Sequence, residues 1–220
     1  MGKCKKGKTT DEAYQRIKNM MYNNELAPGQ KLIYQDLAKK LMFTLSNLIW
    51  LLNRLVYSNL VKYQPNKGYF VGEINKTEAK DLYQAREALE TYLVSSIIQK
   101  IDSKKLNSIR KLYSMYNNNT EDRRLLILKD AQFHLKIAEF ADNSVIFRLL
   151  NGIFEEICLK YRPEYLGDQR IKEAAQEHRR ILNALEKRDA EELVAMIKRH
   201  IRKGMKHVIL SLRKYKGIIL

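Results

Sequence analysis

Several features are scarce in this chain of 220 residues, and each absence excludes a class of protein. Only two cysteines are present, Cys4 and Cys158, so we expect neither a disulfide framework nor a cysteine-rich zinc module. No run of about 18 apolar residues occurs, and the lysine-rich N-terminus is not followed by an apolar stretch, which disfavours a transmembrane helix and a secretory leader. These absences favour a reduced, cytosolic protein. The length of 220 residues favours one large domain or two small ones.

Acidic residues are missing from one long stretch in the first part of the chain. Between Asp36 and Glu73 there are five lysines and arginines and no acid. Residues 1–76 carry 13 basic against 5 acidic residues, or +8, while residues 77–220 carry 28 against 20, also +8, over nearly twice the length. This asymmetry favours nucleic acid or an acidic surface as the partner of the N-terminal third. A lysine-rich solvated face would explain the same composition without a partner.

Glycine and proline are absent from Glu73 to Asn151, where apolar residues recur at three- and four-residue spacing. This pattern is typical of consecutive amphipathic helices. We expect helix starts at Thr77, Ser103, Asn143 and Asp189. The pattern predicts an all-α bundle whose helices run over approximately 77–100, 104–118, 122–141, 143–160, 168–187 and 190–213.

Helix breakers cluster instead in the first 76 residues, at Pro28-Gly29 and between Pro65 and Gly72. Apolar residues at helical spacing predict one helix before Pro28 and two more, around Leu37 and Leu51. The short alternation of apolar residues over 61–71, interrupted by a turn, predicts a two-stranded hairpin. Three helices followed by a hairpin on a basic segment describe a winged helix-turn-helix.

The histidines are confined to the C-terminal half, and three of the four lie on apolar helical faces. Asp130 and His134 are one helical turn apart and therefore project from the same face. His178 and His200 lie 11 residues before and after Asp189, so a helical hairpin turning there would place both about 16 Å from the turn. One carboxylate and three imidazoles at matched depth suit zinc or another first-row divalent ion such as nickel or manganese. Taken singly, each histidine is better explained as an ordinary core residue bonded to a backbone carbonyl, and only the spacing of the set raises the metal to an equal alternative.

Arg86 is a further polar residue on an inward-facing stripe of leucines. Its guanidinium either holds the carboxylate of a ligand in a bidentate manner or forms an intrahelical pair with Glu90, four residues on. The fourth histidine, His207, has no comparable partner pattern, and we expect it at the surface.

Three segments and the proposed metal ligands carry a family resemblance. Residues 26–38, with Leu-Ala-Pro-Gly-Gln-Lys-Leu and Asp-Leu-Ala, look like the entry into a second helix, and residues 59–71 look like a wing. Residues 82–90 look like the first helix of a C-terminal ligand-binding domain. On these motifs the chain resembles GntR-type bacterial transcription regulators, in the subgroup with the FadR-like helical domain called FCD. The resemblance implies an operator-binding homodimer whose FCD domain is of the metal-binding type.

The predicted recognition helix departs from the family pattern. Family members carry a Ser-Arg-x-Pro-Val-Arg motif, but here Leu45 and Ile49 replace both arginines, and Met42 stands where the preceding turn usually has glycine. Bidentate contacts to guanine are therefore absent from those two positions, so we expect an A·T-rich operator and salt-dependent affinity. The residues predicted to bind DNA are Thr44, Ser46, Asn47, Arg54, Lys62 and Lys67, together with the Lys3–Lys8 arm.

These observations predict a ligand-responsive transcription regulator and not an enzyme. Residues 1–76 would bind the operator, and residues 77–220 would dimerise and sense a small organic acid beside the metal, with Arg86 as an effector anchor. The alternative is a metal- and ligand-binding module whose operator specificity is lost or altered. A metal-dependent hydrolase is disfavoured because it needs an open metal position and a positioned base. Glu177 is the only acid adjacent in sequence to a proposed ligand, and neighbours on a helix point in different directions.

Overall fold

The computed structural model describes residues 10–117 and 122–216. Contacts within the chain divide it into two compact units, called here the N-terminal unit (Met1–Glu73 with Leu159–Tyr161) and the C-terminal unit (Ile74–Cys158 with Arg162–Leu220). The predicted boundary after residue 76 lies three residues beyond this division. The Lys3–Lys8 arm lies outside the described residues.

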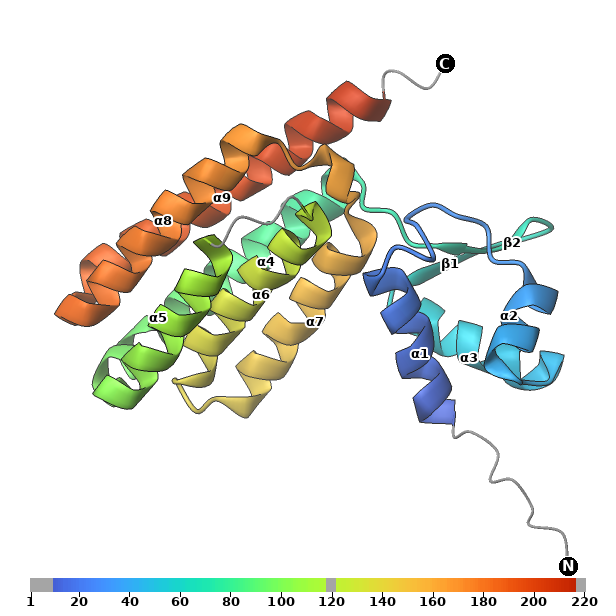
Figure 1. Ribbon diagram of the computed structural model, residues 1–220, viewed down its shortest axis with the longest axis horizontal. Helices are drawn as coiled ribbons and strands as arrows, with labels where there is room; N and C mark the ends of the chain where they lie inside the picture. Colours follow the sequence, from blue (N-terminus) through green and yellow to red (C-terminus); the bar gives the residue numbers. More distant parts are fainter. Residues whose placement is uncertain (1–9, 118–121, 217–220) are drawn as a thin grey trace, which may run out of the picture. The chain divides into compact units, whose positions relative to one another are not determined.

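The N-terminal unit consists of three short helices followed by a two-stranded hairpin (Figure 1). In chain order these are α1 (Thr10–Tyr22), α2 (Tyr34–Leu41), α3 (Leu45–Tyr57), β1 (Val61–Gln64) and β2 (Gly68–Val71). This order confirms the predicted winged helix-turn-helix.

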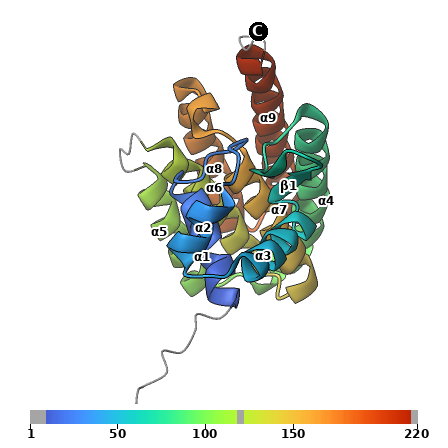
Figure 2. The same ribbon diagram turned by 90° about the vertical axis from the view of Figure 1, so that its right-hand side faces the viewer.

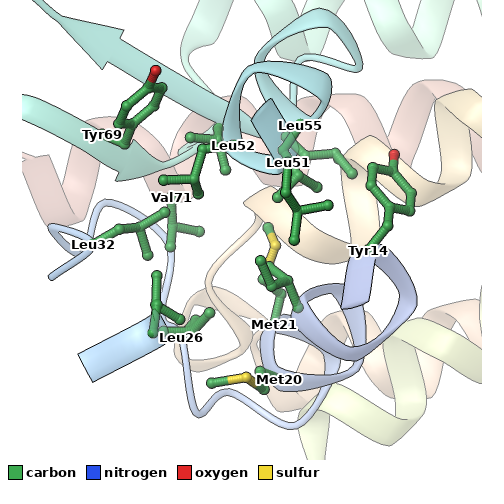
Figure 3. Packing of buried hydrophobic residues seen from close by; sticks show 14 of the residues in the cluster. Tyr14, Met20, Met21, Leu26, Leu32, Leu51, Leu52, Leu55, Tyr69 and Val71 are labelled. Atoms are coloured by element: carbon green, nitrogen blue, oxygen red, sulfur yellow. The ribbon is translucent and has the colours of Figure 1, made fainter. Parts of the chain in front are cut away.

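Leucines of α3 form the centre of the core of this unit. Leu48, Leu51, Leu52 and Leu55 follow the three- and four-residue spacing of one helical face, and all four are buried. Their cluster also contains apolar residues of α1 and of the hairpin, among them Met21 (Figure 3). Burying this face fixes α3 in the unit and leaves its opposite face to solvent.

The hairpin pairs Val61 with Val71 at its base and Gln64 with Gly68 at its tip. A bridge between Lys31 and the second strand adds a short third segment to this sheet. At the tip Gly68 has a φ of 96°, a conformation that only glycine adopts readily. The tip carries Lys67 as an exposed residue, as a wing requires.

The backbone conformation of the turn between α2 and α3 explains why GntR-type regulators usually have glycine at this position. Met42 ends α2 in the left-handed conformation, with a φ of 59°, and its side chain is 76% exposed. This conformation is costly for a residue with a Cβ atom. Thr44 then caps α3, because its hydroxyl accepts a hydrogen bond of 3.3 Å from the backbone N–H of Asn47.

In the C-terminal unit the described secondary structure consists of helices joined by short connections, which confirms the predicted bundle. Pairs that pack together include α4 with α9, α8 with α9, and α5 with both α6 and α8; Figure 2 shows α9 beside α4. A short 3-10 turn, Pro163–Tyr165, precedes α8. The helices are α4 (Lys76–Lys100), α5 (Ser103–Asn117), α6 (Arg123–Glu139), α7 (Ser144–Lys160), α8 (Asp168–Lys187) and α9 (Ala190–Lys216).

One of the four expected helix starts, Thr77, is wrong, whereas α5 does begin at Ser103. Asn75, not Thr77, caps α4 by accepting from the N–H of Glu78 at 3.0 Å. The residue before Ser103, Asp102, caps α5, because its carboxylate accepts the N–H of Lys105. The other two, Asn143 and Asp189, accept from the backbone as expected.

Candidate metal centre

Four side chains from three helices of the C-terminal unit converge at one point. Asp130 and His134 come from α6, His178 from α8 and His200 from α9. Each offers one ligand atom, and these four atoms lie within 4.8 Å of one another. The three imidazoles are buried, while the Asp130 side chain keeps a quarter of its surface exposed. The structure therefore brings together all four residues that the spacing singled out.

The convergence follows from the helical hairpin formed by α8 and α9. Arg188 ends α8 with a left-handed φ of 56°, and Asp189 caps α9 by accepting from the N–H of Glu192 at 2.9 Å. Because the turn falls midway between them, His178 and His200 meet at equal depth, with ring centroids 4.8 Å apart. The predicted hairpin geometry is confirmed.

Asp130 lies among the imidazoles. Its Oδ1 is 3.1 Å from Nε2 of His178 and 3.5 Å from Nε2 of His200. Nε2 of His134 is buried and has no hydrogen-bond partner among the described residues. A buried polar atom without a partner is unfavourable, and a cation coordinated there would satisfy it. The donor set, three imidazoles and one carboxylate, fits a first-row divalent ion.

Two buried carboxylates that sequence reasoning did not assign to the site orient two of the histidines. Glu90 Oε2 lies 2.7 Å from Nδ1 of His134, and Glu177 Oε2 lies 2.9 Å from Nδ1 of His200. An ionised carboxylate only accepts, so Nδ1 carries the hydrogen in both rings and Nε2 presents its lone pair. Metal-binding histidines in proteins are usually held in this way.

Each orienting carboxylate is itself paired with a buried arginine. Arg86 Nε donates to Glu90 Oε1 at 2.8 Å, and Arg170 Nη1 donates to Glu177 Oε2 at 2.7 Å. The intrahelical pairing of Arg86 is thus confirmed. Its Nη2, however, is buried and has no hydrogen-bond partner among the described residues, and its guanidinium lies 4.1 Å from the centre of the Phe154 ring. One donor edge of Arg86 therefore remains available to a ligand.

Electrostatics favour the protonation states that a cation needs. Burial alone would raise the pKa of Glu90, but His134 and Arg86 lower it to about 2. Burial likewise opposes ionisation of Glu177, yet its bond to His200 and the charge of Arg170 lower its pKa to about 2. These carboxylates are therefore ionised at neutral pH.

Burial lowers the pKa of two of the three imidazoles, which favours their neutral form. Burial lowers the pKa of His200 to about 3 in spite of its bond to Glu177. Burial also lowers the pKa of His178, and the opposing effect of Asp130 does not restore it. Neutral imidazoles beside ionised carboxylates are the state that binds a divalent ion without first losing protons.

His207 contradicts its expected surface position. It is half-buried, and its Nε2 lies 3.1 Å from the carbonyl oxygen of Tyr165. Burial lowers the pKa of His207. The sequence offered no signal for this contact, because Tyr165 belongs to the short turn before α8.

The residues predicted to bind DNA lie in the N-terminal unit, but not all of them are free. Ser46 and Asn47 are exposed in the first turn of α3, next to the exposed cap Thr44. Lys62 is half-buried, and its Nζ lies 3.5 Å from the carbonyl oxygen of Glu73. Arg54 forms an ion pair with Asp11 of α1, and its guanidinium lies 4.4 Å from the centre of the Tyr14 ring. DNA contact by Arg54 would require this ion pair to break.

The exposed face of α3 is mainly apolar. Leu45, Ile49 and Trp50 are 54%, 43% and 57% exposed. Trp50 was not singled out from the sequence, although it is the one tryptophan of the chain and adjoins Ile49.

No helix in the described part of the chain combines the length and the apolar character that crossing a membrane requires.

The chain is similar in sequence to a family of regulatory domains and to named transcription regulators. Residues 81–203, more than half of the chain, match the FCD domain family. The HTH-type transcriptional regulator YdhC of Bacillus subtilis is 24% identical over 199 residues, which cover 89% of this chain and 88% of YdhC. The Nta operon transcriptional regulator of Aminobacter aminovorans is 23% identical over 195 residues, which cover 88% of this chain and 91% of that protein.

Solved structures show the same fold over almost the whole chain. McbR/YncC of Escherichia coli aligns with a TM-score of 0.72 at 18% identity and covers 94% of this chain and 98% of its own. The GntR structure from Rhodococcus sp. RHA1 aligns with a TM-score of 0.77 at 17% identity, covering 91% and 97%. The family match and the regulatory relatives agree with the two units described above, and none of these proteins is an enzyme. The chain therefore belongs to the GntR-family transcription regulators that carry an FCD domain.

Proposed function

We propose that this regulator binds one divalent ion, zinc, at Asp130, His134, His178 and His200 and responds to a small organic acid at that site. The observation that carries the proposal is the buried, unpartnered Nε2 of His134, set within 4.8 Å of three further ligand atoms. When bound, the ion supplies a positive centre that attracts a carboxylate. Nickel or manganese would suit the same donors.

The effector is proposed to bind between the metal centre and Arg86. Arg86 has already committed Nε to Glu90, whereas its Nη2 is buried without a partner among the described residues. A guanidinium edge in a buried place is a strong donor to a carboxylate. Effector binding would satisfy this donor, and that gain supports a carboxylate in preference to a neutral ligand.

The N-terminal unit is proposed to place α3 in the major groove and the hairpin along the backbone. Thr44, Ser46 and Asn47 would make polar base contacts, and Lys62 and Lys67 would contact phosphates. Leu45, Ile49 and Trp50 present apolar surface to that groove, which suits the thymine methyl group. This is the support for an A·T-rich operator.

We also propose that the protein acts as a homodimer in the cytoplasm. A homodimer would present two copies of α3 to the two halves of a palindromic operator, and the cytoplasm is where such an operator is met. The second candidate function is a metal- and ligand-binding module with altered operator specificity. It is favoured by the lack of arginine in the first turns of α3.

An electrophoretic shift separates these candidates. The full chain is mixed with a labelled duplex from upstream of its own gene, after chelation and after addition of zinc, with and without small organic acids. A retarded band that changes with metal and acid supports the proposal. Metal binding without any specific shift favours the second candidate, and a shift that neither metal nor acid alters contradicts the sensing role.

A further inference from the structure

The outward face of α9 in the C-terminal unit carries an unusual concentration of positive charge. From Ala195 to Lys216 this helix has eight lysines and arginines and no acid. Five of these cations line an open hollow of about 510 Å³. They are Lys198, Arg199, Arg202, Lys203 and Lys206.

The charges lie opposite the helix face that carries the metal ligand. Leu193, Ile197, His200 and Ile201 are buried, while Arg199 and its neighbours at helical spacing are exposed. Arg213 continues the same outward face and is exposed as well. We call the set Lys198, Arg199, Arg202, Lys206 and Arg213 the α9 stripe.

Among the described residues, one acid of the neighbouring helices pairs with the α9 stripe: Glu87, whose pKa is lowered by Arg202 and also by the charge of Lys198. Arg202 pairs with Glu87 of α4 at 2.6 Å, and Lys203, beside the stripe, is held by the buried Glu177 at 2.9 Å. For Lys198, Arg199, Lys206 and Arg213, the described residues offer no ion-pair partner within bonding distance. A row of like charges in which one member is ion-paired is unfavourable by itself and gains from an anionic partner.

The shape of the α9 stripe favours an extended polyanion. Fifteen residues separate Lys198 from Arg213, so at 1.5 Å per residue the stripe is about 22 Å long, the length of about six nucleotides of one DNA strand. Every residue that lines the hollow, apart from Ala195, is a lysine or an arginine, so an anion that binds there meets positive charge along its length. A second copy of the same face would repel it, which disfavours a symmetric contact.

We propose that the α9 stripe is a second DNA-contacting surface, which binds the phosphate backbone without reading sequence. It goes beyond the proposed function but shares its premise that the chain binds DNA through the N-terminal unit. Each phosphate contact adds to affinity by releasing counterions, so the α9 stripe steepens the dependence of DNA binding on salt. Base readout stays with α3.

The test measures DNA affinity of the full chain by fluorescence anisotropy at salt concentrations from about 50 to about 200 mM. The probe is a labelled A·T-rich duplex of about 30 base pairs, a length that leaves room for both surfaces. The variant Arg199→Ala/Lys206→Ala is compared with Lys104→Ala/Lys111→Ala, which removes the same charge from exposed positions on α5. All four side chains are exposed, and equal melting temperatures verify that both variants are folded.

We expect the α9 variant to bind more weakly and its salt slope to fall by about 2, while the α5 variant matches wild type. Equal slopes in wild type and the α9 variant would overturn the inference. An equal loss in both variants would also overturn it, because net charge alone would then explain the effect. Lys67→Ala distinguishes the two proposals: if it weakens binding and the α9 variant does not, DNA binding by the N-terminal unit stands and only the inference fails.

Discussion

The two units differ in how far the polar side chains of their proposed sites are buried. In the C-terminal unit the three imidazoles, Glu90 and Glu177 are almost entirely buried, and the two glutamates are paired with buried arginines, Arg86 and Arg170. In the N-terminal unit the side chains proposed to meet DNA are exposed, apart from the half-buried Lys62, and apolar residues beside them on α3 are exposed as well. A buried site is determined by its own partners, whereas an exposed one is completed by the molecule that it binds.

The largest expected effect comes from breaking a buried pair. Glu90→Ala leaves the Arg86 guanidinium buried without a carboxylate, so we expect it to lower the free energy of unfolding by about 3–5 kcal/mol in urea titrations. Asp11→Ala breaks the exposed Arg54 ion pair of the other unit and is expected to cost less than about 1 kcal/mol. Equal losses in the two variants would contradict the contrast between the units.

Acidification should weaken the C-terminal unit well before Glu90 and Glu177, whose pKa values are lowered to about 2, are protonated. The pKa of His200 is lowered from 6.5 to about 3 and that of His178 is also lowered, so below about pH 6.5 the unfolded chain binds protons that the folded chain does not. Stability therefore falls with pH, by about 1.4 kcal/mol per pH unit for each such proton. Urea unfolding of the chelator-treated protein checks this, with His178→Ala/His200→Ala as the variant whose profile flattens. A wild-type profile that is level between about pH 7 and about pH 5 would refute the assignment.

Base readout should depend on the exposed face of α3. Asn47→Ala is expected to weaken binding to the preferred sequence by about 1–3 kcal/mol and to leave non-specific binding nearly unchanged. Lys67→Ala should weaken both alike, because a phosphate contact carries no sequence information. The fluorescence of Trp50, which is 57% exposed on this face, reports both titrations. A G·C-rich consensus selected from random duplexes would rule out the proposed readout.

The smallest effect concerns the backbone of the N-terminal unit. Met42 holds a φ of 59° with most of its side chain in solvent, so Met42→Gly removes strain while losing little burial. We expect a gain of up to about 1 kcal/mol in the free energy of unfolding, measured in urea. Met42→Ala keeps the Cβ atom and serves as the control, which should show no such gain. If the glycine variant is less stable than wild type, the left-handed turn is not the reason for the family's glycine.

Sequence reasoning succeeded where periodicity or symmetry fixes a position. The helices of the C-terminal unit and the hairpin follow from the 3.6- and 2-residue periods and from the turn residues between them. His178 and His200 could be paired because equal distances from Asp189 place them at one depth. These predictions needed only the geometry of one element or of one hairpin.

Contacts between helices distant in the sequence were not predictable in the same way. Glu177 was set aside because neighbours on a helix diverge, yet it reaches the centre because His200 of α9 presents Nδ1 to it. Glu90 was weighed only as a partner of Arg86, and its bond to His134 depends on where α6 packs against α4. The same holds for Arg54, whose ion pair with Asp11 arises from the packing of α1 on α3.

The metal content of the purified chain tests the central claim most directly. Wild type, His134→Ala/His178→Ala and His207→Ala are incubated with zinc, freed of unbound ion by gel filtration and measured by elemental analysis. The account predicts about one ion per chain in wild type and in His207→Ala, and close to none in the double variant. Equal metal in wild type and the double variant, or none in wild type after zinc, nickel and manganese in turn, would contradict it.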